Sequence, residues 1–120
     1  MSQQRTLQQK RAKQAFTDVN SVQDSVQKEY GSLVRGLPAL IQSDGLATTL
    51  VFLQAKGKAH HKDAYKHLSA WVMKQLGEEG DLMQWLLKVD SFDYRQATTE
   101  TMAYLTWLKR FAEAKGIGDE

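Results

Sequence analysis

The sequence predicts an all-α protein, a single compact bundle of five or six helices with a long helix at each end. One proline and eight glycines among 120 residues leave few interruptions for helices. Apolar residues recur at steps of three and four along most of the chain, which is the spacing of one helix face. Hydrophobic residues make up 42% and charged residues 25% of the chain, the balance of an ordinary globular domain.

The length is that of one domain with one hydrophobic core, so we expect residues 1–120 to form a single helical domain. We expect residues 1–6 and 116–120 to be frayed, as the ends of most domains are. Ten large side chains are predicted to form the core: Phe16, Val19, Leu50, Phe52, Leu53, Leu68, Trp85, Leu105, Leu108 and Phe111.

The N-terminal half is predicted to begin with one long amphipathic helix. Apolar residues keep helical spacing from Ala12 onward, so this helix is expected to run from Thr6 to Tyr30. In the segment that follows, Pro38 either begins a new helix in its first turn or kinks the existing one. A turn at residues 43–45 precedes a central helix over residues 46–56, which is apolar on several sides and therefore surrounded.

The C-terminal half is predicted to hold three further helices. Gly57 ends the central helix, and residues 58–61 lead into a helix that continues to Leu76. Asp81 can cap a short helix over residues 82–89, and Asp90 with Ser91 begins the final helix.

The final helix is expected to present two different faces, at about 100° of rotation per residue. One is an apolar stripe of Ala97, Leu105, Leu108, Phe111 and Ala112. The opposite row is polar without being acidic, and comprises Arg95, Thr99, Thr106 and Arg110. Trp107 lies at the flank of the stripe or beyond it, so it is either part of a wide core face or an exposed anchor for a neighbouring subunit.

The sequence carries no sign of disulfides, secretion or a membrane span. It has no cysteine, which excludes disulfides and thiolate metal sites and fits a reducing compartment. The first residues are polar with no apolar run behind them, and the apolar patch near residues 46–53 is far shorter than the ~20 residues of a membrane helix. We therefore expect a cytoplasmic protein with no membrane partner.

The three histidines are the first candidates for an active site, because histidine titrates near neutral pH. His60, Asp63 and His67 fall on one face of the predicted helix, but about 10.5 Å of helical rise separates His60 from His67, too far to hold one metal ion. We expect a solvated helix face here, with no metal. Phosphate-loop and nucleophile motifs are absent from the sequence, so we expect no cofactor and no enzymatic activity.

Charge is distributed unevenly although the net charge is only +2. Residues 56–76 carry a local charge of +4 and residues 77–100 a local charge of −4. These blocks are either solvated helix faces or complementary patches for head-to-tail association. Lysines and arginines at helical spacing suit sequence-independent contact with phosphates. The candidates for contact with a nucleic-acid backbone are Lys56, Lys58, Lys62, Lys66, Arg95, Arg110, Lys10 and Lys13, with Lys28 on the same predicted helix as the last two.

Several segments together resemble one family. They are residues 30–33, Leu37–Ile41, Asp44–Leu46, Phe52–Lys56 and the helix from Tyr94 to Ala112. The chain resembles the small α-helical subunit of the Cmr-type (type III-B) CRISPR ribonucleoprotein effector complex. Asp44 departs from the asparagine expected more often before the Gly-Leu pair, and both residues suit helix caps and turns.

The resemblance implies a non-enzymatic subunit that is present in several copies beside the subunits that hold the guide RNA. It implies as partners the other subunits of the complex, further copies of this chain, guide RNA and target RNA. Two alternatives remain from the residues. One is a helical scaffold that contacts only protein, and the other is a small nuclease built from His60 or His61 with Lys58 or Lys62.

Overall fold

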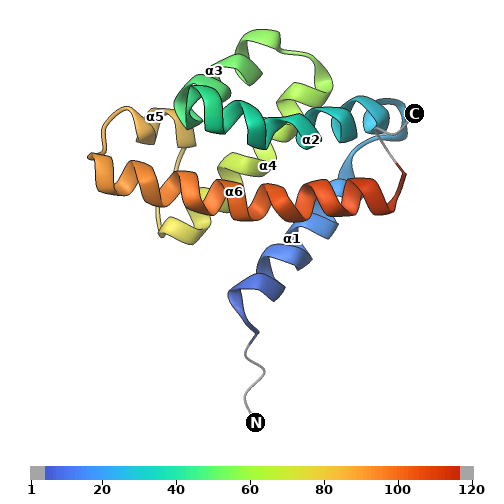
Figure 1. The fold of residues 1–120 in the computed structure, drawn as a ribbon, viewed down its shortest axis with the longest axis horizontal. Coiled ribbons are helices and arrows are strands. Elements are labelled where there is room, and N and C mark those ends of the chain that lie inside the picture. Colours follow the sequence, from blue (N-terminus) through green and yellow to red (C-terminus); the bar gives the residue numbers. More distant parts are fainter. Residues whose placement is uncertain (1–4, 117–120) are drawn as a thin grey trace.

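The computed structural model describes residues 5–116, which form six α-helices and one short 3-10 helix (Figure 1). The elements are α1 (Leu7–Ser21), η1 (Asp24–Val26), α2 (Gln27–Asp44), α3 (Leu46–Lys56), α4 (Ala59–Leu76), α5 (Leu82–Leu86) and α6 (Ser91–Ala114). The all-α prediction is confirmed. The expected fraying of residues 1–4 and 117–120 lies outside the described residues. Thr6 is not frayed, because its side chain and that of Gln9 cap the first turn of α1 reciprocally.

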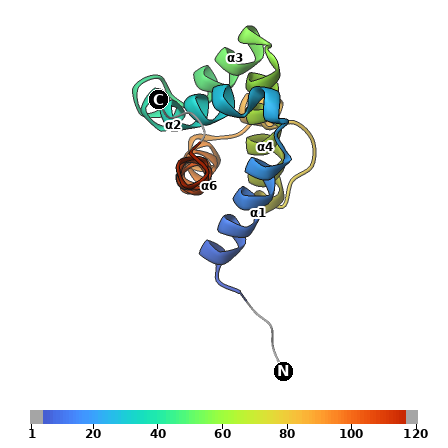
Figure 2. The same cartoon turned by 90° about the vertical axis from the view of Figure 1, so that its right-hand side faces the viewer.

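The longest helix, α6, organises the packing. Its 24 residues span about 36 Å, and α1, α2 and α4 all pack against it. Figure 1 shows α1 crossing α6 and α2 running beside it, and Figure 2, which looks along α6, shows α4 on the same side as α1. The remaining helices pack in a second tier, with α3 against α2 and α4, and α5 against α3 and α4.

The first predicted helix, Thr6 to Tyr30, is wrong in its extent. The chain leaves the helix at Val22, which is extended (φ −71°, ψ 133°), and passes through η1 before α2 begins. Val22 is nonetheless buried, and the Gln27 side chain donates a hydrogen bond to its carbonyl oxygen (3.0 Å). The apolar spacing therefore continues across a break, because the valines on both sides of it point into the same core.

The other predicted elements agree with the structure apart from two details. Pro38 lies inside α2, so the interpretation that it begins a new helix is wrong. The short helix ends at Leu86 and not at Val89. Asp81 and Asp90 cap α5 and α6 as predicted, accepting hydrogen bonds from the backbone N–H groups of Gln84 (3.1 Å) and Asp93 (2.9 Å).

The predicted core is right in most of its members and wrong at Phe16. Those that are fully buried are Val19, Leu50, Leu53, Leu68, Leu105 and Leu108. Those that are half-buried against the core are Phe52, Trp85 and Phe111. Phe16 is 55% exposed. The buried positions on this side of α1 are Ala15 and Val19, whose small side chains allow the close approach of α6, and Phe16 lies at the edge of that contact, 5.5 Å from the Phe111 ring.

Two adjacent residues of α3 test the packing. Leu50 is fully buried and Val51 is 52% exposed. Leu50→Ala should lower the free energy of unfolding by about 2–5 kcal/mol because it removes buried methyl groups and leaves a cavity. Val51→Ala is the matched control and should change it by less than about 0.5 kcal/mol. Urea denaturation measures both values, and equal effects would contradict the assigned orientation of α3.

Candidate nucleic-acid interface

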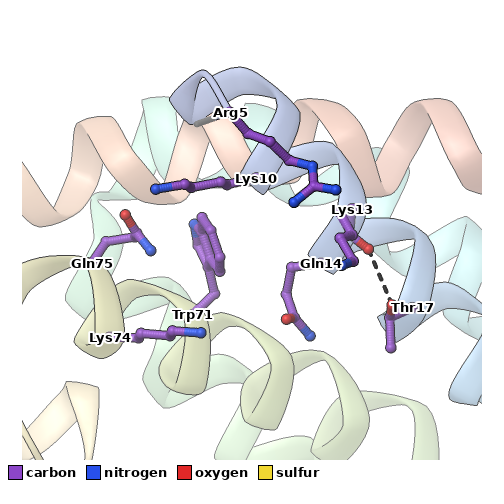
Figure 3. A pocket seen from close by; sticks show the side chains of 8 residues that line it. All are labelled: Arg5, Lys10, Lys13, Gln14, Thr17, Trp71, Lys74 and Gln75. Atoms are coloured by element: carbon purple, nitrogen blue, oxygen red, sulfur yellow. Dashed lines mark hydrogen bonds between the residues drawn. The ribbon is translucent and has the colours of Figure 1, made fainter. Parts of the chain in front are cut away.

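A groove with a volume of about 480 Å³ lies between α1 and α4. It exists because α1 and α4 both pack on α6 and contribute little backbone contact to each other. Figure 3 shows the side chains that line it. They are Arg5, Lys10, Lys13, Gln14 and Thr17 from the N-terminal side and Trp71, Lys74 and Gln75 from α4.

The groove is strongly cationic. Four of its eight lining residues, Arg5, Lys10, Lys13 and Lys74, carry a positive charge, and none of the eight is acidic. Within residues 5–116, these four side chains are not within ion-pair distance of an acidic group. In Figure 3, Lys10 and Lys74 lie on opposite sides of the Trp71 ring. Positive charges gathered around one groove raise the local positive potential, so the arrangement favours an anion there.

The Trp71 side chain is held in place by a buried acidic residue of α6. Trp71 is only 4% exposed, and its indole N–H donates to Glu100 Oε2 at 2.8 Å. Arg11 on α1 donates to both oxygens of the same carboxylate, each at 2.8 Å. Burial alone would raise the pKa of Glu100, but the hydrogen bonds from Arg11 and Trp71 hold it below its ordinary value. The carboxylate is therefore ionised, and the positive charge of Arg11 balances it beneath the groove. Glu100 does not cancel the positive charge of the groove residues.

A second pocket, of about 170 Å³, adjoins the groove and shares Gln14, Trp71 and Lys74 with it. Its other lining residues are Asp18, Lys66, His67 and Ala70. Asp18 accepts hydrogen bonds from the Tyr104 hydroxyl and from Gln14 Nε2 (2.9 Å). Burial raises the pKa of Asp18 to about 6, against the opposing effects of Gln14 and Lys66.

His67 is buried in the structure, so the predicted solvated face is wrong at this residue. Its Nδ1 is 2.7 Å from the Tyr30 hydroxyl, and its Nε2 is 3.3 Å from Ser21 Oγ. Because the Ser21 hydroxyl already donates to the carbonyl of Asp18, Nε2 carries the proton and Nδ1 accepts from Tyr30. Burial lowers the pKa of His67 to about 4. Neither nitrogen of this ring is free to act as a base.

The other two histidines lie nearer the N-terminal end of α4. The ring centroids of His60 and His61 are 4.1 Å apart, and His61 packs edge-on against Phe52. His61 is buried, its Nδ1 has no hydrogen-bond partner in the described structure, and burial lowers its pKa. The structure does not bring His60 or His61 together with His67. In the part of the chain that is described, no three His, Cys, Asp or Glu residues are grouped to hold a metal ion.

The structure divides the predicted phosphate contacts among separate surfaces. Lys10 and Lys13 line the groove, and Lys66 lines the adjoining pocket. Lys56, Lys58 and Lys62 lie around the other end of α4, where Lys56 sits over the Phe52 ring at 5.8 Å. Arg95 and Arg110 are both exposed on α6, but about 22 Å of helix separates them.

Trp107 lies half-buried at the seam between α1 and α6. Its indole N–H donates to Gln8 Oε1 at 3.2 Å, its ring stacks on Phe111 at 5.8 Å, and Arg110 lies over it at 5.4 Å. The side chain therefore packs within this chain and remains partly exposed. Trp71 and Arg5 line the groove although they were not predicted as site residues, and Lys74 belongs to the positively charged block over residues 56–76. The available signal was the spacing of Trp71 and Lys74, which places them on one face of α4.

Fold and site together define a small helical protein with a cationic groove. Comparison with known proteins assigns it more narrowly. Residues 7–115 match the family described as "CRISPR-associated protein (Cas_Cmr5)". The chain therefore belongs to the Cas_Cmr5 family of small CRISPR subunits, which confirms the resemblance drawn from its sequence. None of the helices within residues 5–116 is long and apolar enough to cross a membrane.

Individual relatives agree with this assignment. A Thermus thermophilus protein described as "CRISPR system Cmr subunit Cmr5" is 32% identical over 93 residues, which cover 72% of this chain and 74% of that protein. A Thermotoga maritima protein with the same description is 30% identical over 119 residues, covering 97% and 89%. The crystal structure of a Cmr5 family protein from Thermus thermophilus superposes with a TM-score of 0.79 at 30% identity, covering 92% of this chain and 97% of that one.

The burial of His67 predicts a specific dependence of stability on pH. Between about pH 6.5 and pH 4 the unfolded chain binds a proton at this residue and the folded chain does not, so acidification should lower the free energy of unfolding by up to about 3 kcal/mol through His67. His67→Gln should make the free energy of unfolding depend less on pH in this range. Asp18 has a raised pKa and contributes the opposite sign, so Asp18→Asn should steepen the profile. Urea denaturation at a series of pH values measures both, and parallel profiles for all three proteins would contradict the assignment.

Proposed function

We propose that the chain is a non-catalytic subunit of a cytoplasmic Cmr-type CRISPR effector complex, where it contacts the backbone of guide and target RNA through the groove between α1 and α4. The observation that carries this proposal is the set of four cations that line the groove with no acidic partner among the described residues. A groove lined by lysine and arginine attracts phosphates without distinguishing sequences. Base pairing between guide and target can then supply the sequence specificity.

The family supports this proposal through the relatives' description as subunits of a CRISPR Cmr system. The structure supports the non-catalytic role through three buried titratable groups that are engaged in hydrogen bonds. Glu100, Asp18 and His67 each make hydrogen bonds across helices, and these bonds connect the elements around the groove.

We further propose that copies of the chain associate head to tail. Both ends of α6 expose apolar side chains, but their charges differ: residues 87–95 carry two acidic and two basic side chains, and residues 109–115 carry three basic and one acidic. Near its start, Leu87 (74% exposed) and Phe92 (57%) accompany Asp90 and Asp93. Near its end, Phe16 lies against Phe111 beside Trp107, in a stretch that also carries Lys109, Arg110 and Lys115. Asp90 and Asp93 of one copy can meet Lys109 and Arg110 of the next while the apolar side chains of the two ends pack together, and such a heterologous contact can repeat from copy to copy.

A helical scaffold without RNA contact is the second candidate function, and the exposed apolar side chains are the observation that favours it. Large apolar side chains exposed near one another are typical of protein contacts. In this scheme the cations of the groove would meet acidic groups of a neighbouring subunit.

Two sets of three lysines distinguish these functions and locate the RNA. Replacing Lys10, Lys13 and Lys74 by Ala should weaken binding of unrelated RNA sequences by similar factors and should reduce the slope of log affinity against log salt by about 2, because each phosphate contact contributes about 0.7 to 0.9. Replacing Lys56, Lys58 and Lys62 removes the same charge from the other end of α4 and is the matched control. Filter binding between about 50 and 200 mM salt measures both sets.

The reverse ranking of the two sets would place RNA on residues 56–62. Absence of RNA binding by the wild-type chain and by its assembled complex would favour the scaffold.

Association through the ends of α6 predicts a separate effect on assembly. Leu87→Ser with Phe92→Ser should weaken incorporation into the complex at least tenfold while the isolated chain keeps its unfolding midpoint, because both side chains lie mostly in solvent. Val51→Ser, at another exposed apolar position, is the control. Reconstitution with tagged partner subunits measures incorporation. Normal incorporation of the double variant would exclude this end of α6 from the contact.

A further inference from the structure

We propose that the second pocket receives one unpaired nucleobase from an RNA strand whose phosphates lie in the groove, and that it prefers bases that carry an amino group to uracil. This inference rests on the proposed function, because the groove must hold RNA for its neighbour to receive a base. The inference adds the nucleobase as a ligand and a preference among bases, neither of which follows from phosphate contact alone.

The position and size of the pocket suit one planar ring. Its volume of about 170 Å³ is below the range of about 300–1,000 Å³ typical of whole small-molecule sites. Its floor consists of the buried side chains of Asp18, His67 and Trp71, and Lys66, Ala70 and Lys74 form an exposed rim. A base within a duplex is stacked on both faces and cannot enter such a hollow, whereas an unpaired base can be turned out of its strand.

The route from groove to pocket is continuous, because Gln14, Trp71 and Lys74 line both. Figure 3 shows Trp71 at the centre of the groove with Lys74 and Gln14 to either side of it. Lys66 and Lys74 at the rim can meet the phosphate of the nucleotide whose base enters. The strand on either side of that nucleotide then remains on Lys10 and Lys13.

The floor of the pocket selects by its hydrogen-bonding groups. His67 is neutral and both its nitrogens are engaged by Tyr30 and Ser21, so it offers no donor. The Asp18 carboxylate accepts from Tyr104 and Gln14, and each of its oxygens retains one further lone pair. Amino groups of adenine, cytosine and guanine can donate to it. Uracil presents two carbonyl oxygens beside its one N–H, and these are repelled by a carboxylate.

The test uses the full chain and an RNA duplex that contains one unpaired internal nucleotide. Adenine, cytosine and guanine at that position should bind roughly 5- to 100-fold more tightly than uracil or an abasic unit. Asp18→Asn presents an amide N–H to the base and should reduce this preference while keeping the fold, since asparagine can still accept from Tyr104. Equal affinities for all five RNAs would overturn the inference.

Ala70→Leu provides a variant that changes no charge and no hydrogen bond. Leucine at the rim should close the pocket, remove the preference among unpaired bases, and leave the affinity for fully paired RNA and its salt slope unchanged. Ala55→Leu at an exposed position of α3 is the matched control and should keep the preference. If Ala70→Leu behaves as wild type, the base does not enter this pocket.

Competition by free nucleotides distinguishes recognition of a single nucleotide from recognition of the shape of the RNA. Guanosine monophosphate should compete with the RNA that carries unpaired guanine at lower concentration than uridine monophosphate does, and identical competition by both would count against base selection. Failure of the proposed function has a different result. In that case neither paired RNA nor RNA with an unpaired base binds at any salt concentration.

Discussion

The contact on which the arrangement of helices depends is the buried cluster of Arg11, Trp71 and Glu100. A carboxylate inside a protein is tolerated only when charged and hydrogen-bonding groups compensate for lost water. Here Arg11 comes from α1, Trp71 from α4 and Glu100 from α6, so compensation requires all three helices at once. Removing Glu100 would take this acceptor from both Arg11 and Trp71, and removing Arg11 would leave the carboxylate with Trp71 as its only hydrogen-bond donor within the described residues. The cluster therefore sets the positions of α1 and α4 relative to α6, and with them the width of the groove.

A second set of buried polar contacts continues from this cluster along the seam. Tyr104, one turn after Glu100 on α6, stacks on Trp71, and its hydroxyl group donates a hydrogen bond to Asp18. Tyr30 on α2 and Ser21 at the end of α1 both contact His67. Each contact joins a different pair of elements, and polar contacts are more demanding in geometry than apolar ones. They specify one register for helices whose apolar faces alone would allow several.

The parts of the fold that could be predicted are those fixed by nearby residues. Asp81 and Asp90 satisfy backbone donors three residues away, so their helix starts were visible in the sequence. The break at Val22 was not, because its side chain keeps the apolar spacing while its backbone is extended. Lys10 and Lys13 were predicted as phosphate contacts, but their meeting with Lys74 depends on how α1 and α4 pack on α6. The burial of His67 likewise depends on Tyr30 and Ser21, residues 37 and 46 positions away.

Within residues 5–116, the charged side chains around the groove fall into two groups, one that is paired in the interior and one that is unpaired along the groove. In the interior, the carboxylates of Glu100 and Asp18 each accept hydrogen bonds from another helix. These bonds compensate for the water that each carboxylate loses on folding. In the groove, Lys10, Lys13 and Lys74 are among the lining residues, and none of the lining side chains is acidic. Such an arrangement raises the positive potential along the groove, and an acidic residue at Gln14 or Thr17 would lower it. A groove with this potential suits the anionic partner proposed for it, because no acidic side chain of the groove already pairs with its cations.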